Sequence, residues 1–420
     1  MTDALRYPRL RWPLDIRLEQ IEQQQVLIIN CPLGISEKPL ALMPAVGPVL
    51  ACFDGTLSVE EISEKFKDFG VEKEHVKALV KLLDENLFLA SPHFFAAEQK
   101  VKEDFINSRV RKAALAGLGY SSIASELDQE LEQYLVKSNQ ENESLVDQDY
   151  TLEPQLVGLI APHIDYKRGG KTYGLTYRHL QPKENILYIL FGTAHQYSSN
   201  LFHLTLKDFE GPLGTALCDK DFVRRLAGFY GWDRSFSDEL LHKREHSLEL
   251  QLPFITKIQK EPCIVPILVS SFHHMLLEKK MPDKYEIYEK FISSLVKCIQ
   301  LVITEGRKIC VIAGVDLAHI GTHFGDPEPL SEEALRVVRE QDSILIDALK
   351  ERDKAKLFSH ICEKRDNRKV CGFPSLYTFV DLHERLGIKY NTKLFSYEQA
   401  VDWQNDRCVS FMGMGFYSTS

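Results

Sequence analysis

The sequence contains no uninterrupted apolar run of about 18 residues, the length that a membrane-spanning helix needs. The charges at its start are not followed by the apolar stretch of a signal peptide, so no such signal is expected. Basic residues are not in excess either, because 51 Lys and Arg stand against 60 Asp and Glu, a net charge of −9. Nucleic acids are bound largely through basic patches. We therefore expect neither a membrane nor a nucleic acid as a partner.

A disulfide framework is also absent. The nine cysteines are odd in number, no two of them form a CxxC pair, and several lie in apolar runs such as "KICVIAGV" and "EPCIVPILV". A buried free cysteine behaves as a small apolar residue. This usage is typical of a reducing compartment, so we expect the protein to be cytoplasmic.

The composition is that of a globular protein, with 44% hydrophobic and 26% charged residues over 420 positions and no internal repeat. Residues 1–95 predict one small module. In "FDGTLSVEEISEKF" an Asp-Gly turn precedes Ser58 and Glu61, whose spacing is that of a helix capping box. "EHVKALVKLLDENLFLA" then predicts an amphipathic helix that leads into a short apolar strand. We expect a winged-helix-like domain, with "QVLIINCPLG" supplying strand structure before the helices.

The remainder of the chain has a different pattern. Residues 96–108 predict a helical linker, since "HFFAAEQKVKEDFINS" has neither Gly nor Pro. From residue 109 to 420 apolar strands alternate with helices, which predicts a layered α/β domain. The expected strands are 156–163, 185–193, 263–271, 308–316 and 409–417, and the expected helices are 171–180, 218–229, 245–258, 283–305, 331–351 and 371–386. The strands are continuously apolar, as is typical of strands covered on both faces.

Three of these apolar segments lead directly to a histidine. "LVGLIAPH" ends at His163, "NILYILFGTAH" at His195 and "KICVIAGVDLAH" at His319. In open α/β sheets ligands bind beyond the carboxyl ends of the strands, so we expect these side chains to converge on one crevice. A single histidine at such a place is more often structural, but three in the same context favour a site.

Two further segments are candidates for the same site. "REHSLELQLPFI" places His246 and Glu249 three residues apart, on one face of a helix. Cys371 directly precedes a helix, whose N-terminus would favour the thiolate form. The remaining histidines of the domain that we considered are interpreted as surface or packing residues: His179, His273, His274 and His323.

The motifs resemble known families. "LACFDGTLSVEEI" and "LVKLLDENLFL" are similar to the PqqD-like family, winged-helix-like modules that hold peptides for radical S-adenosylmethionine enzymes. "APHIDY", "GTAH", "EHSLELQLPFI", "VDLAHIG" and "CGFPS" occur in the order of the Memo family motifs, from "RKAALAGLGY" to "VSFMGMGFY". With its added N-terminal module, the chain resembles the long bacterial form of that family, AmmeMemoRadiSam system protein B.

The Memo resemblance implies a fold similar to that of class III extradiol dioxygenases, with a metal site at the corresponding place. Carried over by motif, the metal ligands are His163, His195 and Cys371. The family's Asp and His in "SDFCHWG" fall on Asp316 and His319, and its "EHS" begins at Glu245 and includes His246. Three motifs depart from the family: "DLAHIG" lacks its Cys and Trp, "CGFPS" lacks the histidine of "CGRHP", and "AGLGY" replaces "AGSWY".

Two imidazoles and a thiolate suit iron or copper, and zinc is also chemically acceptable. A carboxylate such as Asp165 or Asp316 would fix a ligand histidine. His319 is the expected general base, because its usual pKa lies near neutrality, and Asp316 and His246 complete the catalytic set.

We expect a dioxygenase-like redox enzyme that acts on a small molecule and works with a radical S-adenosylmethionine protein or peptide bound through residues 1–95. The alternative is a non-catalytic protein that presents a peptide or protein to such an enzyme. A third interpretation, a hydrolase with Cys371 as nucleophile and His319 as base, lacks an identifiable oxyanion hole.

Overall fold

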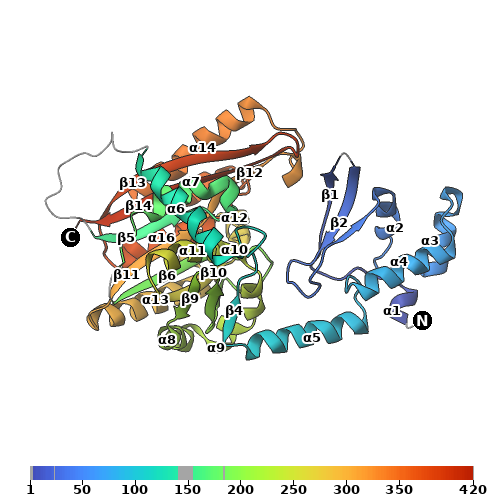
Figure 1. The fold of residues 1–420 in the computed structure, drawn as a ribbon, viewed down its shortest axis with the longest axis horizontal. Coiled ribbons are helices and arrows are strands. Elements are labelled where there is room, and N and C mark those ends of the chain that lie inside the picture. The colour runs from blue at the N-terminus through green and yellow to red at the C-terminus, as the bar shows by residue number, and fades with distance from the viewer. Residues whose placement is uncertain (1–2, 23, 141–154, 183–184, 420) are drawn as a thin grey trace. The chain divides into compact units, whose positions relative to one another are not determined.

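The computed structural model describes residues 3–22, 24–140, 155–182 and 185–419. The chain divides into two compact units, Met1–Ser108 and Arg109–Ser420 (Figure 1). Among the described residues, no helix combines the length and the apolar character that crossing a membrane requires.

The N-terminal unit consists of a small antiparallel sheet, one short helix before it and further helices after it. Its strands, in the order β1-β2-β3, are β1 (Asp15–Ile21), β2 (Gln24–Asn30) and β3 (Leu40–Leu42). Its helices are α1 (Asp3–Arg6), α2 (Gly47–Leu50), α3 (Val59–Lys65), α4 (Lys73–Glu85) and α5 (Pro92–Asn107). Ile29, Ile62 and Leu83 are fully buried in a core that this unit forms from its own residues. The helical linker expected over 96–108 falls within α5, whose residue Phe94 belongs to the same core.

The capping box expected at the start of α3 is confirmed. Ser58 Oγ accepts a hydrogen bond from the Glu61 N–H at 3.2 Å, and the Glu61 carboxylate accepts one from the Ser58 N–H at 2.7 Å. The short strand expected after α4 is wrong. Leu87 has a φ of 62° at the end of that helix, and Leu89 forms only an isolated bridge with Leu10.

Replacing Ser58 by alanine is expected to destabilise the N-terminal unit by about 1 kcal/mol, because the first turn of α3 loses its cap. The free energy of unfolding from urea titration measures this effect. Ser63→Ala in the same helix is the matched control, since Ser63 caps nothing and its hydroxyl donates only to the Val71 carbonyl at 3.3 Å. Equal stability of the Ser58 variant and the wild type would contradict the structural role of this cap.

The C-terminal unit is built on one large mixed sheet with the strand order β12-β14-β5-β11-β6-β10-β9-β8-β4, while β13 pairs with β14 and β7 with β10. Its strands are β4 (Val110–Lys112), β5 (Leu156–Ala161), β6 (Ile186–Thr193), β7 (Phe202–Leu204), β8 (Asp208–Gly211), β9 (Gly214–Cys218), β10 (Cys263–Val269), β11 (Lys308–Gly314), β12 (Asp316–Ile320), β13 (Tyr390–Asp402) and β14 (Arg407–Ser418). The four central strands β5, β11, β6 and β10 are parallel neighbours, so their carboxyl ends lie at one edge.

Helices cover both faces of this sheet, which confirms the expected layered α/β architecture (Figure 1). Along β6, Leu187, Ile189 and Phe191 face one core, whereas Tyr188 and Leu190 face the other. The first core includes α8 (Lys220–Tyr230), α13 (Glu286–Thr304), α14 (Glu332–Glu351), α15 (Lys354–Glu363) and α16 (Phe373–Arg385). The second includes α6 (Ala124–Gln140), α7 (Tyr166–Tyr177), α10 (His246–Glu249) and α11 (Leu252–Ile258). Two short helices, α9 (Trp232–Phe236) and α12 (His273–Leu277), complete the unit.

The five expected strands are present as β5, β6, β10, β11 and β14, and differ from the prediction mainly at their ends. The segment expected as 308–316 stops at Gly314, and the chain enters a separate strand, β12, at Asp316. The helix expected over 245–258 is divided into α10 and α11, with Pro253 in the first turn of the second helix. The prediction missed the helices α6, α9, α12 and α15 and the strands β4, β7, β8, β9 and β13, whose bounds are given above.

Candidate metal centre

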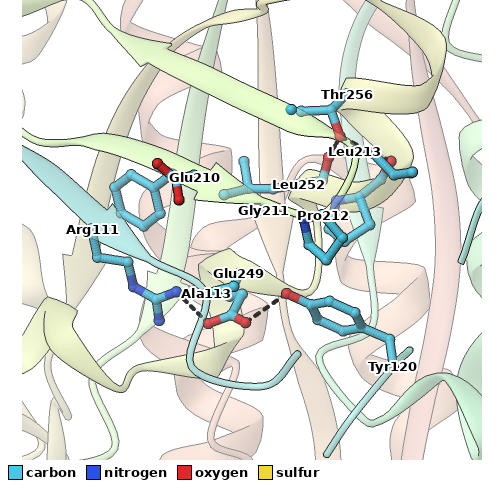
Figure 2. A pocket seen from close by; sticks show the side chains of 13 residues that line it. Arg111, Ala113, Tyr120, Glu210, Gly211, Pro212, Leu213, Glu249, Leu252 and Thr256 are labelled. Carbon is cyan, nitrogen blue, oxygen red and sulfur yellow. Dashed lines mark hydrogen bonds and ion pairs between the residues drawn. The ribbon is translucent and has the colours of Figure 1, made fainter. Parts of the chain in front are cut away.

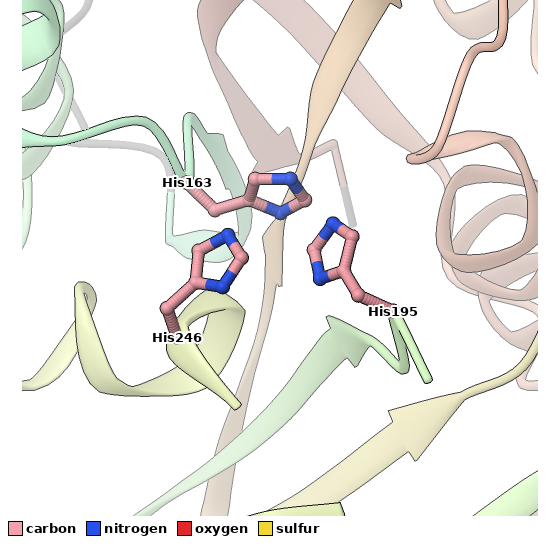
Figure 3. A group of neighbouring side chains, drawn as sticks. All are labelled: His163, His195 and His246. Atoms are coloured by element: carbon pink, nitrogen blue, oxygen red, sulfur yellow. The ribbon is translucent and has the colours of Figure 1, made fainter. Parts of the chain in front are cut away.

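Three histidine side chains meet at the carboxyl edge of the central strands. In the part of the chain that the structure describes, His163, His195 and His246 form a group whose ligand atoms all lie within 4.8 Å of one another (Figure 3). The ring centroids of His195 and His246 are 4.5 Å apart, and His163 lies 5.0 Å and 5.2 Å from them. Three imidazoles at this spacing can share one ion.

The sheet explains why two of these residues meet. His163 stands two residues after β5 and His195 two residues after β6, and both strands pair with β11 in parallel. The third histidine comes from a different element, since His246 is the first residue of α10.

Helix α10 rests directly on the sheet edge. Ser247 Oγ donates to the Thr193 carbonyl at 2.9 Å, and Gln251 Nε2 donates to the Pro162 carbonyl at 2.9 Å. Glycine in β11 permits this approach, because a Cβ on Gly314 would lie 2.4 Å from the Ser247 carbonyl oxygen. The same hydrogen bonds thus connect the helix that carries His246 to the strand ends that carry the other two histidines.

Hydrogen bonds determine which ring nitrogen His163 and His195 can offer to an ion. His163 Nδ1 is 3.0 Å from the Gly314 carbonyl oxygen, and His195 Nδ1 is 2.9 Å from Glu245 Oε1. Both acceptors hold a proton on Nδ1 and leave Nε2 for an ion. The Glu245 carboxylate also accepts from the backbone N–H groups of His195, His246 and Ser247, at 2.8–3.0 Å.

The electrostatics of the cluster follow from burial and from Glu245. Burial lowers the pKa of His163 well below its usual value and that of His246 to about 4, so both rings are neutral near pH 7. Neutral imidazole is the form that binds metal. Burial lowers the pKa of His195, but the charge and hydrogen bond of Glu245, together with those of Cys371, outweigh burial and raise that pKa well above its usual value. The His195 and His246 side chains are 30% and 35% exposed and that of His163 is 2% exposed, so the cluster opens to solvent beside the first two.

The cysteine expected as a ligand lies beside the cluster. Cys371 Sγ is 3.3 Å from His163 Nε2. A nitrogen and a sulfur bound to one ion are separated by about this distance. Cys371 does precede a helix, α16, but burial raises the pKa of its thiol, so the expected lowering by the helix N-terminus does not prevail.

Asp316 also contacts the cluster. Its Oδ1 accepts from the His163 N–H at 2.9 Å, and its Oδ2 is 3.7 Å from His163 Nε2. Burial raises the pKa of Asp316 to about 7.

The expected base, His319, lies within β12 and not in a loop at a strand end. Its Nδ1 is 3.2 Å from the Leu317 carbonyl oxygen and 3.1 Å from that of Lys369, which leaves Nε2 available. Burial, with a smaller contribution from His195, lowers the pKa of His319 to about 4. The ring is therefore neutral near pH 7 but is a weaker base than its usual pKa of about 6.5 suggests.

Two expected participants lie elsewhere. Asp165 caps α7, where it accepts from the Arg168 backbone N–H at 3.1 Å, so it does not orient a ligand. Glu249 pairs with Arg111 and is not part of the histidine group. The i, i+3 spacing therefore did not place both side chains in the cluster.

Glu245 was expected only as part of a motif, and its role in holding His195 has no signal in the sequence pattern. An acidic residue directly before a helix is a recognisable capping signal. Its contact with His195, 50 positions away, depends on tertiary structure and has no local signal.

Comparison with known proteins gives a consistent result. A family model described as "Memo-like protein" matches residues 111–415. A MEMO1 family protein of Aquifex aeolicus is 25% identical over 393 residues, which cover 93% of this chain and 96% of the relative. A MEMO1 family protein of Methanosarcina acetivorans is 29% identical over 255 residues, 60% of this chain and 82% of the relative. One of Thermus thermophilus is 27% identical over 300 residues, 70% of this chain and 81% of the relative.

Proposed function

Because the chain belongs to the family of Memo-like proteins, we propose that it binds one redox-active metal ion, iron or copper, and acts as a dioxygenase-like oxidoreductase on a small molecule. The observation that carries this proposal is the convergence of His163, His195 and His246. Zinc would also fit three imidazoles, so the identity of the ion is part of the proposal.

The donor atoms suit such an ion. His163 and His195 each present Nε2, and His246 supplies a third imidazole. Cys371 Sγ is near enough to His163 to act as a fourth, softer ligand, which favours copper or a redox-responsive iron over magnesium or calcium. The partial exposure of His195 and His246 leaves a side from which a small molecule can reach the ion.

An iron or copper ion bound here supplies electron-transfer chemistry and a position for oxygen. The protein residues supply the rest of the site. Glu245 fixes the orientation of His195, and Asp316 accepts from the backbone beside His163. We assign proton transfer to His319 Nε2, because His319 Nδ1 is held by backbone carbonyl oxygens. His246 would act as a ligand in addition to, or in place of, its expected catalytic role.

The fold is proposed to be similar to that of class III extradiol dioxygenases. Three features support this proposal: the parallel central strands, the histidine cluster at their carboxyl ends, and the helices on both faces of the sheet.

For the N-terminal unit we propose a PqqD-like, winged-helix-like module that binds a radical S-adenosylmethionine protein or a peptide substrate of one. The support is that this unit closes its own core, and that the similarity to the Aquifex aeolicus relative extends over 93% of the chain. The long bacterial form of the family, AmmeMemoRadiSam system protein B, is the corresponding assignment for the whole chain.

Deleting residues 1–108 is expected to leave a folded protein with unchanged metal affinity, because the metal cluster and its hydrogen bonds lie entirely within Arg109–Ser420. Circular dichroism and a metal titration of the truncated protein measure these two properties. The same deletion should abolish binding of the radical S-adenosylmethionine partner. A truncated protein that folds but binds metal at least 10-fold more weakly would contradict this division of roles.

The proposed function is tested with protein purified without oxygen and reconstituted separately with Fe(II), Cu(I) and Zn(II). One ion per chain should remain after desalting, as measured by elemental analysis. The iron or copper form should then consume oxygen with ascorbate as electron donor, and His319→Ala should slow this reaction while retaining the metal. Stoichiometric metal without oxygen consumption in either form would contradict the oxidoreductase and favour a non-catalytic binding protein.

A further inference from the structure

A buried ion pair joins strand β4 to the C-terminal end of α10. Arg111 in β4 and Glu249, the last residue of α10, have side chains that are 1% and 3% exposed (Figure 2). The Arg111 guanidinium also donates from Nε to the His242 carbonyl at 2.9 Å and from Nη2 to the Glu245 carbonyl at 2.9 Å. One side chain thus contacts the backbone before His246 and the carboxylate after it.

Glu249 is also held by a second set of donors. Its carboxylate accepts from the backbone N–H groups of Ala114 at 2.9 Å and Leu115 at 2.8 Å, and from the Tyr120 hydroxyl at 2.7 Å. Figure 2 shows Arg111 and Tyr120 reaching Glu249 from opposite sides. Residues 111–120 are therefore bound to α10 although they are more than 120 positions away in sequence.

A helix of four residues has no stability of its own in water, so its position depends on tertiary contacts. One set of contacts is the hydrogen bonds of Ser247 and Gln251 to the ends of the central strands. The other set is the contacts of Arg111 and Glu249. Glu245 connects the two sets, because its carbonyl oxygen accepts from Arg111 while its carboxylate accepts from His195.

We propose that Arg111 and Glu249 are positioning residues of the metal centre, which hold His246 and Glu245 in the geometry that metal binding needs. This inference rests on the proposed metal site. A buried ion pair contributes little net stability compared with an apolar pair of similar volume. The pair instead fixes geometry, because the three guanidinium nitrogens of Arg111 bind three separate points on the segment from His242 to Glu249.

The test uses the full-length protein and Co(II), whose visible absorbance reports binding. The variant Arg111→Met with Glu249→Leu replaces the pair by apolar side chains. Because buried groups such as the Ala114 and Leu115 N–H lose their acceptor, the thermal unfolding midpoint should fall, and affinity is measured at a temperature where circular dichroism shows the variant to be folded. Its Co(II) affinity should fall by about 10- to 100-fold, the range that residues supporting metal ligands typically show. Tyr120→Phe, which removes one hydrogen bond to Glu249, should lower affinity by about 2- to 10-fold and carries the test if the double variant does not fold.

Two comparisons separate positioning from general stability. Asp381→Asn weakens another buried ion pair, with Lys354 towards the far end of α16, and should leave Co(II) affinity unchanged. In a His246→Ala background, the Arg111 and Glu249 changes should weaken binding much less than in the wild type, because they act partly through His246. A folded double variant with wild-type affinity, or an equal loss in both backgrounds, would overturn the inference. Failure of the wild type itself to bind Co(II) would contradict the proposed metal site instead.

Discussion

Replacing His163 by alanine is expected to lower metal affinity by at least about 100-fold, the upper end of what residues that only support metal ligands contribute. His163 is the most buried of the three histidines, and its Nε2 lies 3.3 Å from Cys371 Sγ and 3.7 Å from Asp316 Oδ2. The alanine variant loses His163 Nε2, the nitrogen beside which Cys371 and Asp316 lie. Competition with a chromophoric chelator measures the affinity of the variant against that of the wild type.

His179→Ala is the matched control for this experiment. His179 is partly buried, but it stacks on Phe395 with ring centroids 4.2 Å apart and contacts none of the site histidines in the described interactions. Its replacement should leave metal affinity unchanged. If His163→Ala and His179→Ala bound metal as tightly as the wild type, the histidine cluster would not be the site.

Replacing Gly314 by alanine is expected to destabilise the protein by about 1–3 kcal/mol, the usual effect of overpacking a dense interior. The new Cβ would lie 2.4 Å from the Ser247 carbonyl oxygen and 2.5 Å from Gln251 Nε2, so α10 has to move away from the sheet. Since α10 carries His246, metal affinity should fall together with stability. Urea unfolding and a metal titration of the same preparation measure both effects.

Gly228→Ala provides the control, because it makes the same change in α8 where a Cβ meets no atom within 4 Å. Alanine is favoured over glycine within a helix, so this variant should gain about 0.5–1 kcal/mol and keep its metal affinity. A Gly314→Ala protein that is destabilised but binds metal normally would show that the close contact between α10 and β11 does not determine the site.

Local patterns predicted the layers of the fold and named all three histidines of the cluster as candidates, His246 in a catalytic role. Continuous apolar strands identified β5 and β6, and parallel pairing then placed His163 and His195 at the same edge. By contrast, β13 was missed because most of its side chains are partly exposed and polar. It is a strand because it pairs with β14 along nearly its whole length, which its own sequence does not indicate.

The residues that hold the histidines in place were less predictable from the sequence than the histidines themselves. Arg111, Glu245 and Glu249 make contacts that span 50 to 138 sequence positions. Such contacts depend on where α10 rests, and that position is determined by glycine in a neighbouring strand. The spacing of His246 and Glu249 suggested a shared site, whereas His246 lies with the other two histidines and Glu249 pairs with Arg111.

Anomalous X-ray diffraction from crystals of metal-reconstituted protein, recorded at the iron, copper and zinc absorption edges, tests the central claim most directly. One anomalous peak is expected per chain, about 2.0–2.2 Å from a ring nitrogen of each of His163, His195 and His246. A sulfur ligand from Cys371 would lie at about 2.3 Å from the same peak. A peak bound by other residues, or no peak at any of the three edges in crystals grown with the metal, would contradict the account.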